Sequence, residues 1–271
     1  MTCLLNWKPD GQSCCCPDYF EVLDGMTALN VPGKEIVPCP LDSFPQGFRA
    51  LVIGATGAIG AAFVSHLQNH PKCGVVEALH RQSQPAIDFN EEDSIADAAA
   101  SLSGQAPFHL IINAAGVLHS PQFMPEKKLA SLGYDQMMQT FRINTFGPAM
   151  VLNHFSRLLD AERGVMAVLS AKVGSIEDNR LGGWYSYRAS KAALNMFLKT
   201  AAIEVKRTRP NAVLVALHPG TVTSSLSQPF GGADIGQTPA AATGKMLNVI
   251  DQLTPDDSGR FYAYNGERLP W

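Results

Sequence analysis

The sequence predicts an α/β fold, a single Rossmann-type, doubly wound parallel sheet with helices on both faces. From Phe48 onward, short apolar runs alternate with longer segments of helical period. The apolar runs are nearly continuous, which is typical of parallel strands buried on both faces. A glycine-rich stretch follows the first run, where such a sheet passes from its first strand into its first helix.

The individual elements follow this alternation in order. The first strand is the apolar run Phe48–Ile53, and a helical period begins after the glycines that follow it. The same change of period defines the later elements. The predicted strands are residues 48–53, 74–79, 108–113, 165–170, 212–217 and 260–264, and the predicted helices are 58–68, 91–102, one long or two shorter helices within 129–159, 185–207 and 238–253.

Residues 1–46 are predicted to be an irregular extension before one domain, residues 47–271. The extension is rich in Pro, Cys, Asp and Gly and has no sustained period. Three consecutive cysteines cannot all face one metal ion, and paired Cys-x-x-Cys motifs are missing, so we expect free thiols and no metal site. Five of the six cysteines lie in this extension, Cys3, Cys14, Cys15, Cys16 and Cys39.

The composition limits the class of partner. The 24 acidic and 21 basic residues give a formal net charge of −3, so nothing favours a nucleic acid or an anionic membrane as partner. No apolar run reaches the roughly 18 residues that span a bilayer. The first ten residues lack the basic flank and apolar core of a secretory signal. We therefore expect a cytoplasmic protein with a small-molecule substrate.

The turn after the first strand, Gly54-Ala-Thr-Gly57-Ala-Ile-Gly60, suits a dinucleotide. A pyrophosphate needs bare backbone amides and the positive end of a helix, and glycines at a strand–helix junction offer both. The Gly-Lys-Ser/Thr ending of an ATP or GTP loop is missing. We predict cofactor contacts at Gly54, Thr56, Gly57, Ile59 and Gly60, with a tight turn that binds nothing as the alternative.

The end of the second strand favours NADP(H) over NAD(H). A carboxylate there would hold a ribose 2′-hydroxyl, whereas a basic residue pairs with a 2′-phosphate. The strand ends Leu79-His80-Arg81, so Arg81, helped by His80, is the predicted phosphate contact. Glu77 lies within the strand, and a shifted register would reverse this preference. The other interpretation of Arg81 is a solvated surface residue.

Tyr187-Arg-Ala-Ser-Lys191 places a phenol and an ammonium group one helical turn apart. A tyrosine has a reference pKa of about 10, and one cation about 4 Å away supplies about 4 kcal/mol toward its ionised form at an effective dielectric near 20. Lys191 and the positive ring of an oxidised nicotinamide would together make Tyr187 an acid and base. An ordinary exposed helix pair has the same spacing.

Together these motifs resemble the classical short-chain dehydrogenase/reductase family from Phe48 to Trp271, and in finer features its C-factor-like or sniffer-like branch. The resemblance implies that Asp88 contacts the adenine ring and that Asn144 holds a water of the proton relay. It also implies that the helices carrying Asn144 and Tyr187 form the interface of a homodimer or homotetramer. Further cofactor contacts are implied at Asn113, Ala114, Ala115, Gly116, Pro219, Gly220, Thr221, Val222 and Ser224.

The segment after the fifth family strand departs from the family's pattern. A match without gaps puts Ala171 where the family has its catalytic serine. A shift of one residue would bring Ser170 to that position, and Ser175 could reach in from the next turn. Losing such a hydrogen-bond donor typically costs about 100- to 1,000-fold in rate. We expect Ser170 to take the role.

These assignments predict an NAD(P)(H)-dependent oxidoreductase that transfers a hydride between the nicotinamide and a small carbonyl or alcohol substrate. Tyr187 moves a proton, Lys191 assists it and holds the nicotinamide ribose, and Ser170 bonds the substrate oxygen, so Tyr187 and Lys191 are also predicted cofactor contacts. The alternative is an NADP(H)-binding regulator with little turnover, and sugar-nucleotide epimerisation is disfavoured because the chain ends soon after its last strand. Residues 221–237 suit a substrate lid or a plain loop. Trp184, Tyr185 and Phe230 are predicted either to line an apolar pocket or to pack in the core or an interface.

Overall fold

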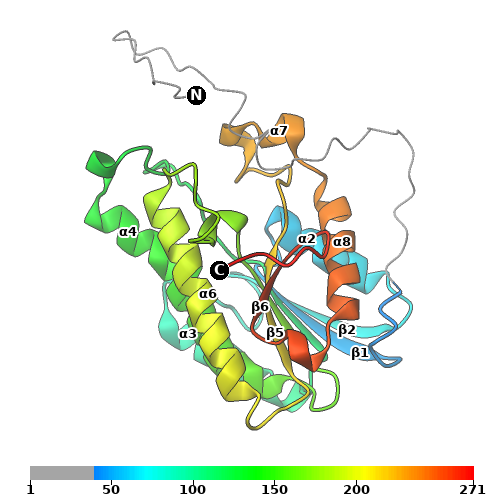
Figure 1. Cartoon of the computed structure of the whole chain (residues 1–271). Helices are drawn as coiled ribbons and strands as arrows, with labels where there is room; N and C mark the ends of the chain where they lie inside the picture. Colours follow the sequence, from blue (N-terminus) through cyan, green and yellow to red (C-terminus); the bar gives the residue numbers. More distant parts are fainter. Residues whose placement is uncertain (1–39) are drawn as a thin grey trace. The chain divides into compact units, whose positions relative to one another are not determined.

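A computed structural model of the chain describes residues 40–271 (Figure 1). Six strands form one entirely parallel sheet in the order β2-β1-β3-β4-β5-β6. The order reverses between β1 and β3, so the predicted doubly wound fold is confirmed. The strands are β1 Phe48–Ile53, β2 Cys73–Leu79, β3 Leu110–Asn113, β4 Val165–Leu169, β5 Val213–His218 and β6 Arg260–Ala263.

Helices cover both faces of this sheet (Figure 1). The alternation of side chains along each strand serves two cores: Leu51 and Ile53 belong to one, whereas Ala50 and Val52 belong to the other. The first core lies under α3 Glu92–Ser101, α5 Gly147–Phe155 and α6 Tyr185–Val205, and the second under α2 Ala58–Gln68 and α8 Pro239–Gln252.

The predicted helical segment 129–159 contains two helices with a wider turn between them. α4, Tyr134–Phe141, continues through the π-helical turn η3, Arg142–Phe146, into α5. Such turns are frequent at functional sites. In this chain the turn contains Asn144, whose side chain is fully buried.

The predicted lid, residues 221–237, has short helices that the sequence did not predict. A 3-10 turn, η6, spans Gln228–Phe230, and α7 spans Gly232–Ile235. The base of the segment is closed by a bridge between Val222 and Gln237. This part of the chain is therefore folded, and both of its ends are held together.

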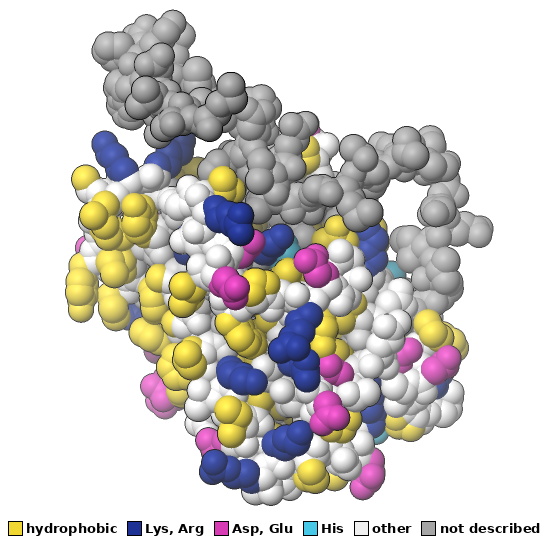
Figure 2. Space-filling view, in the orientation of Figure 1, with side chains coloured by type: hydrophobic (Ala, Val, Ile, Leu, Met, Phe, Trp, Pro, Cys, Tyr) yellow, Lys and Arg dark blue, Asp and Glu magenta, His cyan; other side chains and the backbone are white. Residues whose placement is uncertain are grey.

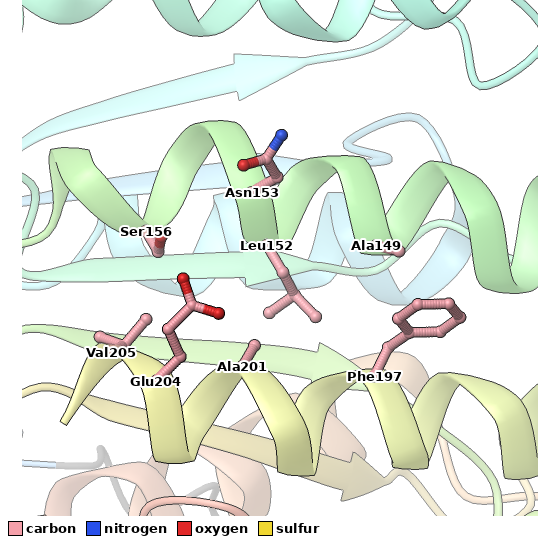
Figure 3. Close-up of a pocket in the computed structure, with 8 residues that line it drawn as sticks. All are labelled: Ala149, Leu152, Asn153, Ser156, Phe197, Ala201, Glu204 and Val205. Atoms are coloured by element: carbon pink, nitrogen blue, oxygen red, sulfur yellow. The ribbon is translucent and has the colours of Figure 1, made fainter. Parts of the chain in front are cut away.

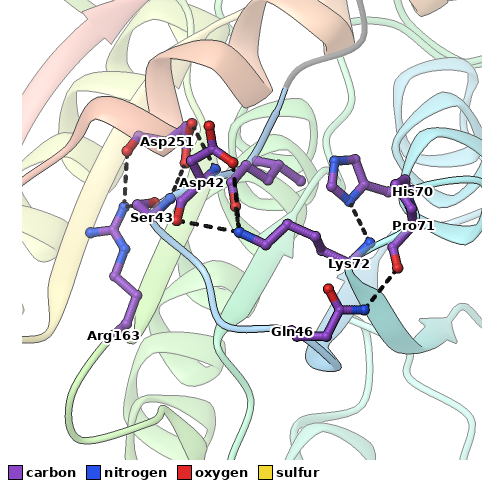
Figure 4. A network of polar contacts seen from close by, with 9 residues as sticks. Asp42, Ser43, Gln46, His70, Pro71, Lys72, Arg163 and Asp251 are labelled. Atoms are coloured by element: carbon purple, nitrogen blue, oxygen red, sulfur yellow. Dashed lines mark hydrogen bonds and ion pairs between the residues drawn. The ribbon is translucent and has the colours of Figure 1, made fainter.

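Residues 40–46, the described part of the predicted extension, pack against the domain. The side chains of Leu41 and Phe44 are buried. The Asp251 carboxylate at the end of α8 accepts the backbone N–H groups of Asp42 and Ser43 (Figure 4). Because these contacts lie before β1, they are at the amino ends of the strands. The remaining extension, with Cys3, Cys14, Cys15, Cys16 and Cys39, lies outside the described residues.

Arg163 connects residues 40–46 to the rest of the domain. Its guanidinium donates to the carbonyls of Leu253 (2.7 Å) and Ile250 (3.0 Å). It also donates to the Ser43 hydroxyl (2.8 Å) (Figure 4). It also lies 4.9 Å from the centre of the Phe44 ring. One side chain thus joins the segment before β1, the loop before β4 and the end of α8.

We expect Arg163→Met to lower the free energy of unfolding by about 2–4 kcal/mol, because several partly buried acceptors lose a charged donor together. Urea unfolding followed by circular dichroism measures this loss. Arg180→Met changes an exposed arginine and should leave the stability unchanged. Equal stability of the two variants would contradict the assigned role of Arg163.

Within residues 40–271, no helix has the length and apolar character needed to cross a membrane. The same residues contain no group of three or more His, Cys, Asp or Glu side chains that could hold a metal ion.

Candidate active site

The glycine turn after β1 packs too closely for side chains. Gly54 has a φ of +81°, and a Cβ on it would lie 2.8 Å from the Ala115 nitrogen. A Cβ on Gly60 would lie only 2.1 Å from the Gly54 oxygen. No side chain caps the first turn of α2, and no acidic residue lies in it. The turn therefore presents bare amides at a helix N-terminus, which fits the pyrophosphate of a dinucleotide.

The neighbouring strand ends in a turn that exposes a cation. The His80 ring nitrogen Nδ1 accepts the Gln82 N–H (3.1 Å), while the His80 N–H bonds the Ser83 hydroxyl (2.8 Å). Arg81 is exposed and has no hydrogen bond or ion pair with another described residue. Glu77 faces Leu51 within the sheet, two residues before the end of β2. Glu77 therefore lies within β2 and not at its tip, which is the register that the predicted preference for NADP(H) assumed.

Asp88 lies in the loop after β2, and the Asn-Ala-Ala-Gly segment begins at the last residue of β3. The Asp88 carboxylate accepts both the backbone and side-chain N–H groups of Asn90. Asn113 is fully buried, and its Oδ1 accepts the Ala115 N–H (3.1 Å). The Ala114 N–H bonds the last carbonyl of β1, on Ile53 (2.8 Å). The segment is therefore fixed directly beside the glycine turn.

Tyr187, Lys191 and Asn144 come together near Gly116. The Lys191 Nζ lies 6.0 Å from the centre of the Tyr187 ring and donates to the Leu169 carbonyl (2.9 Å). A Cβ on Gly116 would lie 3.4 Å from that Nζ and 3.5 Å from the Asn144 Oδ1. The Asn144 amide pairs with the Val117 backbone at 2.8 and 2.7 Å. Two of the predicted site residues, Lys191 and Asn144, thus border one small glycine.

Burial shifts the acidities of both groups. It raises the pKa of Tyr187 to about 12 and lowers the pKa of Lys191 to about 8, because a low-dielectric environment disfavours each charged form. At neutral pH the phenol keeps its proton and most of the lysine keeps its charge. Lys191 alone therefore does not bring the pKa of Tyr187 below its reference value, and ionising Tyr187 requires additional positive charge nearby.

Neither candidate serine is hydrogen-bonded to Tyr187. The Ser170 hydroxyl donates to the Asn195 Oδ1 (2.7 Å), and Asn195 lies two helical turns beyond Tyr187 on α6, about 12 Å along the axis. The Ser175 hydroxyl donates to the carbonyl of Trp271 (3.1 Å). Ala171 directly follows Ser170 and is largely buried. A catalytic role of Ser170 would require its hydroxyl to leave Asn195.

Aromatic rings surround the Tyr187 side of the site. The Trp184 ring lies 6.2 Å from Tyr187 and 5.0 Å from Phe230 of the lid. Phe230 is 5.9 Å from His119, whose Nε2 is 3.2 Å from the Ser225 carbonyl. Of the aromatic residues singled out in the sequence, Trp184 and Phe230 meet here, and Tyr185 is exposed. His119 was missed, although its place just after the Asn-Ala-Ala-Gly segment could have indicated it.

The Pro-Gly turn after β5 is packed against Tyr264 and hydrogen-bonded to Gln237. Gly220 has a φ of +73°, and a Cβ on it would lie 2.6 Å from the Tyr264 ring. The Pro219 carbonyl accepts the Gln237 side chain (3.0 Å). Thr221 is partly buried, Val222 packs into the second core, and the Ser224 hydroxyl lies 3.3 Å from that of Ser227. The turn thus lies beside the base of the lid.

Known proteins resemble this chain over most of its described length. The family model described as short chain dehydrogenase matches residues 49–233. The chain is 34% identical over 188 residues to 1-hydroxy-2-glutathionyl-2-methyl-3-butene dehydrogenase of Rhodococcus sp. (strain AD45), covering 69% of this chain and 80% of that protein. It is 37% identical over 169 residues to C-signal of Myxococcus xanthus, covering 61% of this chain and 93% of that protein.

Solved structures show the same architecture. The carbonyl reductase Sniffer of D. melanogaster has a TM-score of 0.72 at 23% identity, covering 83% of this chain and all of that chain (100%). The NADPH-bound carbonyl reductase from chicken fatty liver also has a TM-score of 0.72, at 24% identity, covering 88% of this chain and 100% of its own. At these identities the likeness concerns the fold.

Proposed function

Since the chain belongs to the short-chain dehydrogenase family of oxidoreductases, we propose that it is an NADP(H)-dependent reductase of small carbonyl compounds. The observation that carries this proposal is the group formed by Tyr187, Lys191 and Asn144 beside Gly116. A protein that only binds a dinucleotide has no need of a buried phenol next to a buried ammonium group.

The bound cofactor supplies the hydride, and the chain supplies the proton and the binding site. Amides of the Gly54–Gly60 turn hold the pyrophosphate, and Pro219-Gly220 lies where the nicotinamide is expected. Tyr187 hands its proton to the substrate oxygen, and the Lys191 charge stabilises the phenolate left behind. Asn144 holds the water that returns the proton. The predicted part of Ser170 is to bond the substrate oxygen.

Absorbance of NADPH, followed as the protein meets aldehydes, ketones and quinones, tests this function. We expect oxidation of NADPH by at least one carbonyl class, with the aromatic wall of Trp184 and Phe230 favouring apolar substrates. Absence of NADPH and NADH binding in a titration would overturn the proposal.

The Arg81 guanidinium supports the preference for NADP(H), and the chicken carbonyl reductase of the same fold is NADPH-bound. We expect Arg81→Ala to weaken NADPH binding roughly 10- to 100-fold, the loss of one charge-assisted pair to a phosphate. Binding of NADH, which lacks the 2′-phosphate, serves as the internal control and should not change. A titration that shows equal weakening of both cofactors would assign Arg81 to the fold instead.

A second copy of the chain is proposed to cover the outer face of α4 and α6. Hydrophobic side chains gather where α4 lies (Figure 2), and exposed apolar residues continue along α6, among them Met196 at 68% exposure. A groove of about 180 Å³ runs between α5 and α6, lined in part by Leu152 and Phe197 (Figure 3). Small-molecule sites typically measure about 300–1,000 Å³, so this groove better suits side chains of a partner.

We expect Phe197→Glu to weaken self-association at least about thirtyfold, because it puts a charge into the centre of that face. Light scattering after size exclusion measures the mass. Ile176→Glu alters an exposed apolar residue outside α4 and α6 and should keep the oligomer. A monomeric wild-type protein at micromolar concentration would contradict the proposed homo-oligomer.

The second candidate function is a regulator that binds NADP(H) and turns over little. The hydrogen bond from Ser170 to Asn195 favours it, since no serine then bonds the substrate oxygen. Tight NADPH binding without turnover on any carbonyl class would select this function. A cytoplasmic location is a further proposal from the sequence.

A further inference from the structure

Glu126 is a buried carboxylate that the proposed reaction does not use. Its side chain is only 3% exposed. Among the described residues, no Lys, Arg or His forms an ion pair with it. Its partners are all at the start of α6. Oε2 accepts the Ser186 N–H (3.1 Å), Oε1 accepts the Ser186 hydroxyl, and the Glu126 carbonyl accepts the Trp184 N–H.

These bonds cap the helix that carries Tyr187. The first amides of a helix have no partner within it, and the N-cap residue of α6, Trp184, offers no side-chain acceptor. Glu126 supplies one from sixty residues earlier in the chain. Its negative charge is also favourable at the positive end of the helix dipole. The buried charge is therefore compensated by the first turn of α6 alone.

The turn that enters α6 is strained and held from two sides. Trp184 has a φ of 52° and a ψ of 44°, a left-handed conformation that residues with a side chain rarely adopt. Glu126 holds its N–H on one side. On the other, the Arg188 Nε donates to the carbonyls of Gly182 (3.2 Å) and Gly183 (3.0 Å). In this conformation the Trp184 ring packs against both Tyr187 and Phe230.

We propose that Glu126 is a positioning residue of the active site, which fixes the first turn of α6 and with it both the Tyr187 phenol and the Trp184 wall of the substrate site. Its kinetic consequence rests on the proposed reductase function. A catalytic group displaced by about 1 Å loses roughly 100-fold in rate. The phosphate turn is on another element, and the Lys191 Nζ is held by the Leu169 carbonyl, so cofactor affinity should change little in Glu126 variants.

The test compares Glu126→Ala, Glu126→Gln and Ser186→Ala with Glu92→Gln, which changes an exposed carboxylate in the first turn of α3. We expect kcat of Glu126→Ala to fall roughly 100-fold, with an unchanged NADPH dissociation constant. Glu126→Gln keeps one acceptor and should recover part of the rate. The double variant Glu126→Ala/Ser186→Ala should be no slower than Glu126→Ala, because both changes remove the same contact. Glu92→Gln should match the wild type.

Trp184 emission gives a readout that needs no turnover. The Trp184 contribution is obtained by subtracting the emission spectrum of the matching Trp184→Phe variant from that of each protein. In Glu126→Ala this contribution should shift to longer wavelength, because the indole gains exposure. A wild-type protein without turnover refutes the reductase function, and the emission shift alone then decides the role of Glu126. A Glu126→Ala protein with wild-type kcat, or with unchanged Trp184 emission, overturns the proposal, even where its melting temperature falls.

Discussion

Tyr187→Phe is expected to lower kcat for carbonyl reduction by about 100- to 10,000-fold, the range of a positioned general acid. The substitution removes one oxygen and keeps the ring that packs against Trp184. The Lys191 Nζ keeps its bond to the Leu169 carbonyl. NADPH affinity and stability should therefore remain those of the wild type.

Tyr185→Phe is the matched control for this prediction. Tyr185 begins the same helix, but its side chain is exposed, so its hydroxyl can be removed without effect on kcat. Initial rates at saturating NADPH measure both variants, and titration of NADPH fluorescence measures binding. Equal rates of Tyr187→Phe and the wild type would remove Tyr187 from the mechanism.

The pKa values of Tyr187 and Lys191 set the pH dependence of the rate. With the pKa of Tyr187 raised to about 12 and that of Lys191 lowered to about 8, both carry their protons at neutral pH. Reduction should be level below pH 8 and fall above it, because Lys191 then loses the charge that stabilises the phenolate. Alcohol oxidation starts from the phenolate, so its rate should rise with pH in the range where Lys191 stays charged.

Local patterns predicted the sheet and much of the site. Each buried strand is one apolar run, and Tyr187 and Lys191 are one helical turn apart, so period alone places them on one face. The glycine turn was predicted for a similar reason, since Gly60 allows the first turn of α2 to lie against the Gly54 carbonyl six residues earlier. These features depend on neighbours a few residues away.

Features that depend on distant segments were not predicted. The direction of the Ser170 hydroxyl is decided by Asn195, which is on a different element. The cap of α6 comes from Glu126, and the π-helical turn at Asn144 goes with side-chain bonds to the Val117 backbone. In each case a residue type common on surfaces is buried because tertiary packing supplies its hydrogen-bond partner. The hydrophobic periodicity of the sequence carries no information about such a distant partner.

Gly60→Ala is expected to weaken cofactor binding and to lower stability as well. The new Cβ would lie 2.1 Å from the oxygen and 2.8 Å from the carbonyl carbon of Gly54, both backbone atoms that no rotamer change can move. The first turn of α2 must therefore shift away from β1. Such overpacking costs about 1–3 kcal/mol of stability. The shifted amides lose about one charge-assisted bond to the pyrophosphate, so the NADPH dissociation constant should rise roughly 10- to 100-fold.

Gly104→Ala separates the effect of this position from that of any added methyl group. Gly104 lies in the 3-10 turn Ser103–Gln105, and a Cβ there would meet nothing within 4 Å, so stability and NADPH binding should match the wild type. Chemical unfolding and NADPH titration of both variants give the two quantities. A Gly60→Ala protein that binds NADPH as tightly as Gly104→Ala would place the pyrophosphate away from the turn after β1. Because that turn adjoins Ala115 and Gly116 beside Lys191, such a result would also move the nicotinamide away from Tyr187.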